Sequence, residues 1–221
     1  NQVMNAKKDL EFFLKKNSKG FNSRDINFAS NNVINSIHNM NEWSWTKKIQ
    51  KNKNIRSIAK VLIGEEIEDF GAELFSKPAK IGLPAPIHQD NYYWCINNSN
   101  ALTVWIALED ADSKNGGVYY IKKSHKLGVL EHKPSFAKGS SQTLKYPESM
   151  KILGRKKVPT LKAGDCIFHH CLVVHGSNPN KSNRARTGWT VRYKAKSGLI
   201  DEFLKSRYER ELKIQITQRT K

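Results

Sequence analysis

Two β-like stretches, far apart in the chain, contain the polar residues that restrict its fold most strongly. The first covers residues 85–94 and includes His88 and Asp90, and the second covers residues 164–177 and includes His175. Side chains alternate between the two faces of a strand, so His88 and Asp90, two positions apart, are predicted to point the same way. We expect the fold to bring His175 to the same place.

These three side chains are the ligand types of a known class of metal site. Two histidines and one carboxylate on one face of an octahedron bind Fe(II) in non-haem oxygenases, and the other positions stay open for a cosubstrate and O2. We therefore predict that His88, Asp90 and His175 bind Fe(II). The competing interpretation treats each of them as an ordinary core or surface residue, and it accounts less well for the three together.

The remaining histidines are predicted to be structural. His169 and His170 are neighbours, so at most one of them faces the metal side of a strand, and both are interpreted as structural residues or as supports of the ligands. Three others have no partner pattern in the sequence and are assigned structural roles: His38, His125 and His132.

A formal net charge of +18 limits the kinds of partner that the chain would attract. The basic residues are spread along the sequence, so we interpret most of them as solvated surface, with an anionic small molecule as the second interpretation. A nucleic-acid substrate is a weaker alternative, because it predicts a contiguous basic groove with stacked aromatic residues. No apolar run is long enough to span a bilayer, so no membrane partner is expected.

Three cysteines, Cys95, Cys166 and Cys171, form no Cys-x-x-Cys pair. Their odd number favours reduced thiols and a cytoplasmic protein over a disulfide framework. Cys166 and Cys171 lie among apolar residues and are predicted to be core residues. No secretory signal is recognised, but the chain begins at Asn1 rather than Met, so the alternative of a targeting segment ahead of Asn1 stays open.

The order of apolar patterns predicts helices first and strands afterwards. Helices are expected at residues 3–16, 31–39 and 54–62, the last ending at Gly64, with a polar loop at 20–30. Strands are expected at 67–76, 88–94, 102–108, 118–121 and 187–193 and in the second metal stretch, and the tail is expected to be helical at about 200–213.

This order predicts a mainly β protein, a β-sandwich or barrel with helices on one face. We expect one domain over residues 1–221, with a helical lead-in at 1–65, a core at 66–195 and a C-terminal tail at 196–221. A polar segment at about 127–160 interrupts the core. Long loops in compact domains are usually functional, so we predict a lid over the substrate, with a surface insertion as the open alternative.

A 2-oxo acid bound to such a metal would need a fixed cation for its far carboxylate. Arg186 begins the strand that follows His175, and a guanidinium there would hold a carboxylate bidentately, which a lysine does less well. Arg184 is the rival, but it is predicted to lie in the preceding turn. Ser177, two residues after His175, would offer a hydroxyl group nearby.

Several short motifs follow one another in a fixed order between residues 77 and 193. They are His88-Gln89-Asp90, Trp105 in an apolar strand, Asn115-Gly116-Gly117, Ser124-His125-Lys126, Gly164-Asp165, His175-Gly176-Ser177 and Arg186. In order and spacing, this set resembles the phytanoyl-CoA dioxygenase family, which belongs to the Fe(II)- and 2-oxoglutarate-dependent oxygenases. A His-x-Asp pair alone would be a weak signal, because it occurs by chance.

The resemblance implies a double-stranded β-helix core, a jelly roll like that of the cupins. It implies the metal ligands His88, Asp90 and His175, and it implies Arg186 on the distal carboxylate of 2-oxoglutarate. Asp90 also separates the chain from related halogenases, which have a small residue at that position so that chloride reaches the iron.

The resemblance also implies which residues form the pocket wall. Gln89, Trp105 and Ser177 are expected near the cosubstrate or substrate, although Trp105 is equally well interpreted as core. Lys77 belongs to a Lys-Pro pair that resembles one in the family, and it is expected to point into the substrate pocket. Strand alternation adds Tyr92, which would share the face of the ligands and contact substrate.

The function implied by the resemblance is hydroxylation of a small organic molecule. Fe(II) would be the cofactor, 2-oxoglutarate and O2 would be consumed, and succinate and CO2 would be released. The basic composition weakly favours an anionic substrate. Two alternatives stay open: a metal-binding jelly-roll module without turnover, and an oxygenase that acts on nucleic acid.

Overall fold

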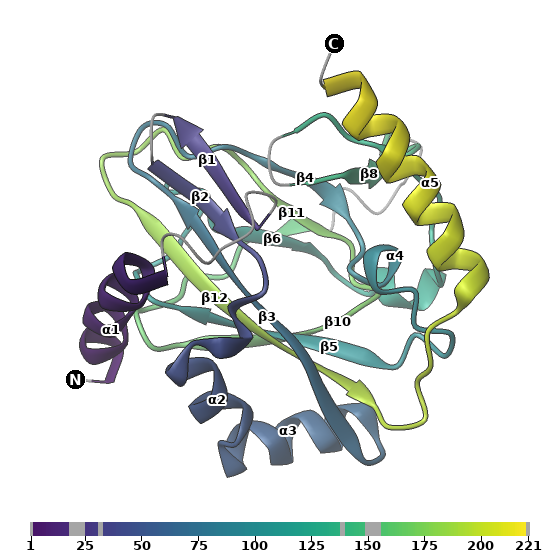
Figure 1. Cartoon of the computed structure of the whole chain (residues 1–221), viewed down its shortest axis with the longest axis horizontal. Helices are drawn as coiled ribbons and strands as arrows, with labels where there is room; N and C mark the ends of the chain where they lie inside the picture. The colour runs from purple at the N-terminus through teal and green to yellow at the C-terminus, as the bar shows by residue number, and fades with distance from the viewer. Residues whose placement is uncertain (1, 18–24, 31–32, 138–139, 149–155, 220–221) are drawn as a thin grey trace.

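Six antiparallel strands form the larger of the two main sheets in this computed structural model, which describes residues 2–17, 25–30, 33–137, 140–148 and 156–219. The order is β1-β2-β3-β12-β5-β10, so strands distant in sequence become neighbours (Figure 1). The bounds are β1 (Ile26–Ser30), β2 (Val33–Ile37), β3 (Ile67–Lys77), β12 (Arg186–Ala195), β5 (Ala101–Ala107) and β10 (Cys166–His170).

Four shorter antiparallel strands form the second sheet, in the order β4-β11-β6-β9. Their bounds are β4 (Ala85–His88), β11 (His175–Ser177), β6 (Val118–Ile121) and β9 (Lys156–Lys157). Residues of both sheets line one cavity. The molecule is therefore the sandwich of two sheets that the sequence predicts, and the cavity lies between them.

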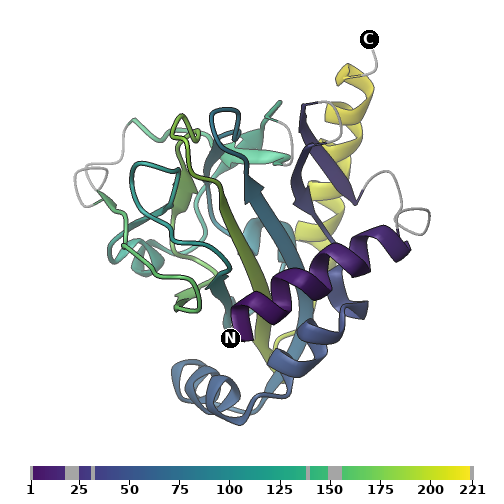
Figure 2. The same cartoon turned by 90° about the vertical axis from the view of Figure 1, so that its left-hand side faces the viewer.

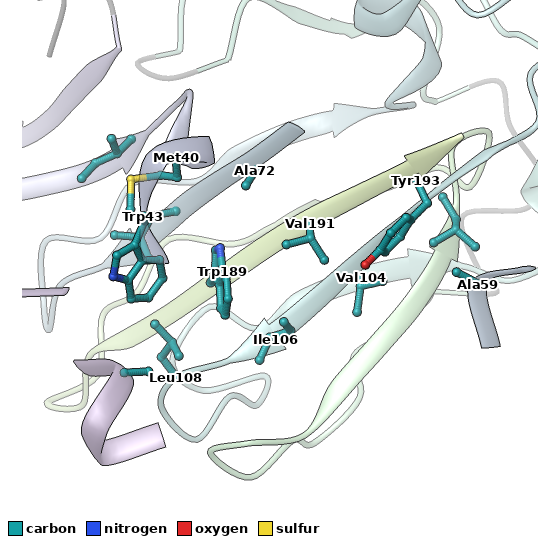
Figure 3. Packing of buried hydrophobic residues seen from close by; sticks show 14 of the residues in the cluster. Met40, Trp43, Ala59, Ala72, Val104, Ile106, Leu108, Trp189, Val191 and Tyr193 are labelled. Atoms are coloured by element: carbon teal, nitrogen blue, oxygen red, sulfur yellow. The ribbon is translucent and has the colours of Figure 1, made fainter. Parts of the chain in front are cut away.

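Strand β12 shows how the sequence separates the core from the cavity. Trp189, Val191 and Tyr193 are fully or almost fully buried in the apolar core, whereas Arg186 and Arg192 line the cavity. Figure 3 shows the three core residues beside apolar residues of the neighbouring strand β5. Because successive side chains face opposite ways, one strand serves both the core and the cavity. Each buried core side chain contributes roughly 1.5–3 kcal/mol.

Helices cover the outer face of the larger sheet (Figure 2). Their bounds are α1 (Gln2–Asn17), the short 3-10 helix η1 (Met40–Glu42), α2 (Ser44–Gln50) and α3 (Lys53–Ile63). The indole of Trp43 packs 4.7 Å from that of Trp189 and donates a hydrogen bond to Asp9 in α1. Asn52 caps α3 by accepting from the Ile55 amide, and Gly64 ends it at a positive φ, as predicted.

The helix predicted at residues 31–39 is wrong. Residues 33–37 form β2, which pairs with β1 and places Ile37 opposite Leu74 of β3. The Val-Ile pair and Ile37 were compatible with a helical stripe, but β-branched residues fit a sheet edge and the neighbouring strand decides the outcome. The predicted loop at 20–30 likewise contains β1, while residues 18–24 and 31–32 lie outside the described residues.

The first metal stretch is shorter as a strand than predicted. Strand β4 ends at His88, and the expected strand at 88–94 is replaced by the helical turn α4 (Asn91–Trp94). Asp90 already has helical backbone angles, φ −61° and ψ −39°. The predicted alternation of side chains therefore stops at His88.

Residues 127–160 contain more regular structure than their composition indicated. After the 3-10 helix η2 (Ser124–Leu127), strands β7 (His132–Pro134) and β8 (Gln142–Leu144) form a small antiparallel sheet, and β9 follows. Gln142 and Leu144 are buried. Residues 138–139 and 149–155, which belong to the predicted lid, lie outside the described residues.

The C-terminal tail forms α5 (Glu202–Arg219), longer than the helix predicted at about 200–213. It lies beside α4 and the β7-β8 sheet (Figure 1). Within the described residues, none of the helices combines the length and apolar composition needed to cross a bilayer. Of the cysteines, Cys95 and Cys171 are buried, but Cys166 is exposed, which corrects its prediction as a core residue.

Candidate active site

Two neighbouring strands bring the distant histidines together. His88 is the last residue of β4 and His175 the first of β11, and they are direct partners across the antiparallel pair. Directly opposite residues have neighbouring side chains, and the two imidazole centroids lie 4.3 Å apart. The chain thus unites residues from its middle and its last third through one strand pairing.

Asp90 joins the histidines by a different route from the predicted one. The backbone turns from β4 into α4, and this turn carries the carboxylate back toward the histidines. Oδ1 of Asp90 lies 3.6 Å from Nε2 of His88 and 3.5 Å from Nε2 of His175. One ligand atom from each residue lies within 4.8 Å of the others, so the three together could hold a metal ion.

The second atoms of these ligands are held by hydrogen bonds. Nδ1 of His88 lies 2.7 Å from the Pro86 carbonyl oxygen, and Nδ1 of His175 lies 2.9 Å from that of Val173. A carbonyl oxygen only accepts, so each Nδ1 carries the proton and each Nε2 presents a lone pair to the centre. This is the tautomer that metal coordination through Nε2 requires.

Asp90 is fixed in the same way. Its Oδ2 accepts a hydrogen bond from Thr103 Oγ1 at 2.8 Å and lies 3.1 Å from Nε2 of His169. Oδ1 is therefore left for the centre. His169 supports a ligand, which is one of the roles that its sequence position indicated, whereas Thr103 was not singled out. Thr103 lies two residues before Trp105 on β5, so strand alternation could have identified it.

Charge at the centre suits a dication. Burial would raise the pKa of Asp90, but His175, His169 and His88 outweigh it and hold that pKa well below its usual range. Burial lowers the pKa of His175 to about 3, despite the opposing effect of Asp90. At neutral pH the centre therefore offers a carboxylate and a neutral imidazole, the forms that bind metal.

Arg186 lies in the same cavity with most of its hydrogen-bonding capacity unused. Its side chain is 2% exposed, and Nη2 donates to the Gly116 carbonyl oxygen at 2.9 Å. Nε and Nη1 are buried and have no hydrogen-bond partner among the described residues. Burial lowers its pKa to about 10, which still leaves the guanidinium charged at neutral pH. A buried cation of this kind is costly unless an anion joins it.

Arg184, the alternative clamp, is excluded from the cavity by its contacts. It is half-exposed and pairs with Asp112 at 2.6 Å. The guanidinium of Arg186 instead lies 5.4 Å from the ring centre of Trp105. That approach depends on Gly188, because a Cβ at this position would overlap the indole of Trp105.

The cavity that contains these groups has a volume of about 600 Å³, within the range of small-molecule sites. Lys77, Trp105 and Ser177, all predicted for the pocket, line it together with Arg186. Lys77 is almost fully buried and donates to the Leu83 carbonyl oxygen. Burial, assisted by Arg186, lowers the pKa of Lys77 to about 6.

Gln89 does not line the cavity, contrary to prediction. It is fully buried and its amide nitrogen donates to the carbonyl oxygens of Gly128 and Leu172, at 2.9 and 2.8 Å. Its amide oxygen accepts from the Leu130 amide at 2.8 Å. The side chain between the two ligands is therefore used entirely to join segments of the protein.

Tyr92 also lies outside the cavity, and its neighbour takes the expected place. The ring of Tyr92 stacks on His132 at 4.1 Å and its hydroxyl group bonds to Glu211 of α5. Tyr93, which strand alternation would turn away from the ligand face, lines the cavity with its ring 5.5 Å from that of His88. The prediction failed because the chain is helical, not extended, after His88.

Two further groups of cavity residues were missed by the sequence analysis. One comes from α5, a helix whose sequence carries no functional motif: Tyr208, Leu212 and Gln215. The other is an ion-paired set in the larger sheet and its edge, including a histidine that was assigned a structural role: His38, Glu73 and Arg192. Neither group belongs to a recognisable spacing pattern.

Comparisons with known proteins point to one family. The family model for phytanoyl-CoA dioxygenase (PhyH) matches residues 3–188. Peroxisomal phytanoyl-CoA dioxygenase of Mus musculus is 27% identical over 56% of this chain and 38% of its own length. A probable alpha-ketoglutarate-dependent hypophosphite dioxygenase of Stutzerimonas stutzeri is also 27% identical, over 66% of this chain and 51% of its own length. The chain thus spans about half or less of the length of these relatives.

A solved structure supports the fold. The crystal structure of EctD from S. alaskensis with 2-oxoglutarate and 5-hydroxyectoine has a TM-score of 0.73 and 20% identity, and it covers 90% of this chain and 70% of that chain. At this identity the likeness concerns the fold, and it confirms the predicted jelly-roll core. The family match over most of the sequence leads to one identification: this chain belongs to the phytanoyl-CoA dioxygenase family.

Proposed function

We propose that this protein is an Fe(II)- and 2-oxoglutarate-dependent oxygenase that hydroxylates a small organic molecule. One observation carries the proposal: a His-Asp-His set lines the same cavity as a buried arginine, two of whose nitrogens have no partner among the residues that the structure describes. The first suits a metal with open positions, and the second suits the carboxylate of a cosubstrate. Relatives named as dioxygenases support the same activity.

The metal would be held by Nε2 of His88, Nε2 of His175 and Oδ1 of Asp90. The donor set fits Fe(II), because two imidazoles and one carboxylate leave positions for a cosubstrate and O2. When bound, the metal supplies the redox chemistry that activates O2 while 2-oxoglutarate is converted to succinate and CO2. The protein's own contribution is to fix these three donor atoms before the metal arrives.

The cosubstrate would be oriented by the basic end of the cavity. The guanidinium of Arg186 would donate to its distal carboxylate, and Ser177 would add a hydroxyl group. The guanidinium of Arg186 lies over the ring of Trp105, and this contact helps to orient it. Arg186 and Ser177 are almost fully buried, so the carboxylate of the cosubstrate would supply the hydrogen-bond acceptors that water otherwise provides.

Asp90 also bears on the type of reaction. A carboxylate at this position occupies the place that a halide would need, so the proposed outcome is hydroxylation. A metal-binding module without turnover would have no use for an unpaired arginine buried in the cavity, and that side chain would be costly to keep. The idea that residues 127–160 act as a lid stays a prediction, although Ser140 and Ser141 line the cavity.

A matched pair of arginine variants tests the proposal. Arg186→Gln should weaken 2-oxoglutarate binding to the Fe(II)-loaded protein about 10- to 100-fold, the effect of losing charged hydrogen bonds. Arg184→Gln, two residues away and outside the cavity, should change it less than twofold. The measurement is anaerobic calorimetry, followed by succinate release with O2 present. Equal effects of the two variants would contradict the assignment of the cosubstrate site.

A further inference from the structure

The cavity contains a second charged group, on a different set of residues from those proposed to bind metal and cosubstrate. Glu73 of β3 accepts from His38 at 2.5 Å through Oε1 and pairs with Nη2 of Arg192 of β12 through Oε2. We call His38, Glu73 and Arg192 the far cluster. The side chains of Glu73 and Arg192 are each 17% exposed and that of His38 is 29% exposed.

The one carboxylate of the far cluster lies between two basic side chains. Burial would raise the pKa of Glu73, but Arg192 and His38 outweigh it and lower that pKa to about 2. Burial lowers the pKa of His38, yet the Glu73 carboxylate outweighs that effect and the net shift is upward. One carboxylate is therefore flanked by an arginine and by a histidine that favours its charged form.

Arg192 is held in place by its neighbours, and its ion pair with Glu73 uses only the N–H groups of Nη2. Its guanidinium lies 5.2 Å from the ring centre of Trp94, in addition to its pairing with Glu73. A guanidinium has five N–H donors in a rigid plane, and Glu73 engages those of Nη2. A preorganised arginine with donors left over is suited to receive a second anion.

The far cluster borders both aromatic and polar residues of the cavity, and Phe75 lies edge-on to His38. Asn27 and Asn35 line the cavity from the β1-β2 hairpin, and Gln215 lines it from α5. The hairpin and α5 occupy the upper part of the molecule in both Figure 1 and Figure 2. Gln215 is 1% exposed, and its Oε1 accepts from no donor in the part of the chain that the structure describes. An occupant with a hydroxyl or amine group would satisfy this oxygen.

We propose that the far cluster is the substrate-binding subsite and that it receives a small hydrophilic anion, whose carboxylate, sulfonate or phosphate group contacts Arg192 and His38. This inference rests on the proposed function, since it takes the His-Asp-His centre as the place of reaction. A hydrocarbon group would offer no hydrogen bonds to Arg192, His38 or Gln215, so the anionic part of the substrate is the part assigned to this subsite. The part of this wall that α5 contributes lies beyond the family-matched residues 3–188.

The test uses small probes of equal shape and different charge. Protein saturated with Fe(II) and 2-oxoglutarate, without O2, is titrated with methanesulfonate, an anion that coordinates metals weakly. Dimethyl sulfone is its neutral counterpart and tetramethylammonium the cationic control. Binding is followed by ligand-observed NMR. A parallel titration with acetate shows whether the subsite prefers a planar or a tetrahedral anion.

Two variants give opposite expected results. Arg192→Gln should weaken methanesulfonate binding at least tenfold, with 2-oxoglutarate affinity changed less than twofold. Glu73→Gln keeps the arginine and removes its internal competitor, so it should bind methanesulfonate two- to tenfold more tightly. Loss of structure would not produce this opposite pair of effects.

The proposal is overturned if methanesulfonate does not bind, if dimethyl sulfone or tetramethylammonium binds as well, or if Arg192→Gln leaves anion binding unchanged. It is also overturned if Glu73→Gln weakens that binding. The proposed function is judged separately, by the preceding titration with 2-oxoglutarate, so a failure of the subsite and a failure of the oxygenase assignment can be told apart.

Discussion

Two arginines on strand β12 point into the same cavity, and they differ in what already neutralises them. Arg192 is paired with Glu73, whereas Arg186 donates to the Gly116 carbonyl oxygen, and its other two nitrogens have no partner in the described part of the chain. Burying an arginine without a carboxylate partner costs free energy. The carboxylate of a bound ligand would offset that cost. The difference indicates a cavity with one end that depends on a bound anion and another that is already balanced and accepts an anion by competition.

The largest expected effect comes from the centre between the two arginines. Asp90→Asn removes the only carboxylate of the His-Asp-His set, so we expect Fe(II) affinity to fall at least 100-fold and succinate release to fall with it. Methanesulfonate binding at the far cluster should stay within twofold. Metal content and turnover are the measurements.

Asp165→Asn is the matched control for that variant. Asp165 lies in a turn, where its carboxylate accepts a hydrogen bond from the Lys162 amide. Its replacement by Asn should leave metal affinity unchanged. If the two variants lost metal to the same degree, the loss could not be attributed to the centre.

The next effect concerns the opposite face of the same strand. Trp189→Ala should lower the free energy of unfolding by about 3–5 kcal/mol, because it empties a buried site packed against Trp43. Both arginines lie on the other face of β12, so the affinities for 2-oxoglutarate and methanesulfonate should change little in the folded fraction. Denaturant titration and the two binding assays separate these outcomes. A selective loss of 2-oxoglutarate binding would show that the faces are not independent.

The smallest effect distinguishes the two ends by pH. The pKa of Lys77 is about 6, so Lys77 is mostly neutral at pH 8 and gains charge as the pH falls through 6. A charged Lys77 beside Arg186 attracts the cosubstrate, so 2-oxoglutarate affinity should rise a few-fold between pH 8 and pH 6. Lys77→Met should remove this rise. Affinities from calorimetry in the absence of O2, compared with the unchanged protein, provide the check.

Lys77 also contributes to stability with a defined sign. Its folded pKa lies below that of the unfolded chain, so the unfolded chain binds the additional proton between about pH 10.5 and pH 6. Stability therefore falls as the pH decreases through this window. Lys77→Met should flatten that part of the stability profile.

The sequence predicted the chemistry of the site better than its local geometry. One cavity does contain His88, Asp90, His175 and Arg186. The sequence allowed this prediction because the order and types of these residues match those of the family. The reason given for Asp90 was wrong, however, since the chain leaves the strand at His88. That early turn also explains why the pocket contains Tyr93 in place of Tyr92.

The errors in the fold have a similar physical origin. Residues 33–37 contain apolar side chains at spacings that suit either a helix or a strand, and pairing with β1 and β3 selects the strand. The walls contributed by α5 and the far cluster depend on contacts between segments distant in sequence, which no local pattern encodes. The division into a lead-in, a core and a tail stays a prediction.

Gln89 has a consequence for anyone who wishes to alter this protein. Its side chain ties the single residue between His88 and Asp90 to the backbone at Gly128, Leu130 and Leu172. Loops near an enzyme's entrance are the usual targets for redesign. Replacing residues 128–130, however, would disturb hydrogen bonds of Gln89 that fix the distance between His88 and Asp90. A graft there that leaves every cavity residue untouched should still change how tightly the proposed Fe(II) site binds metal.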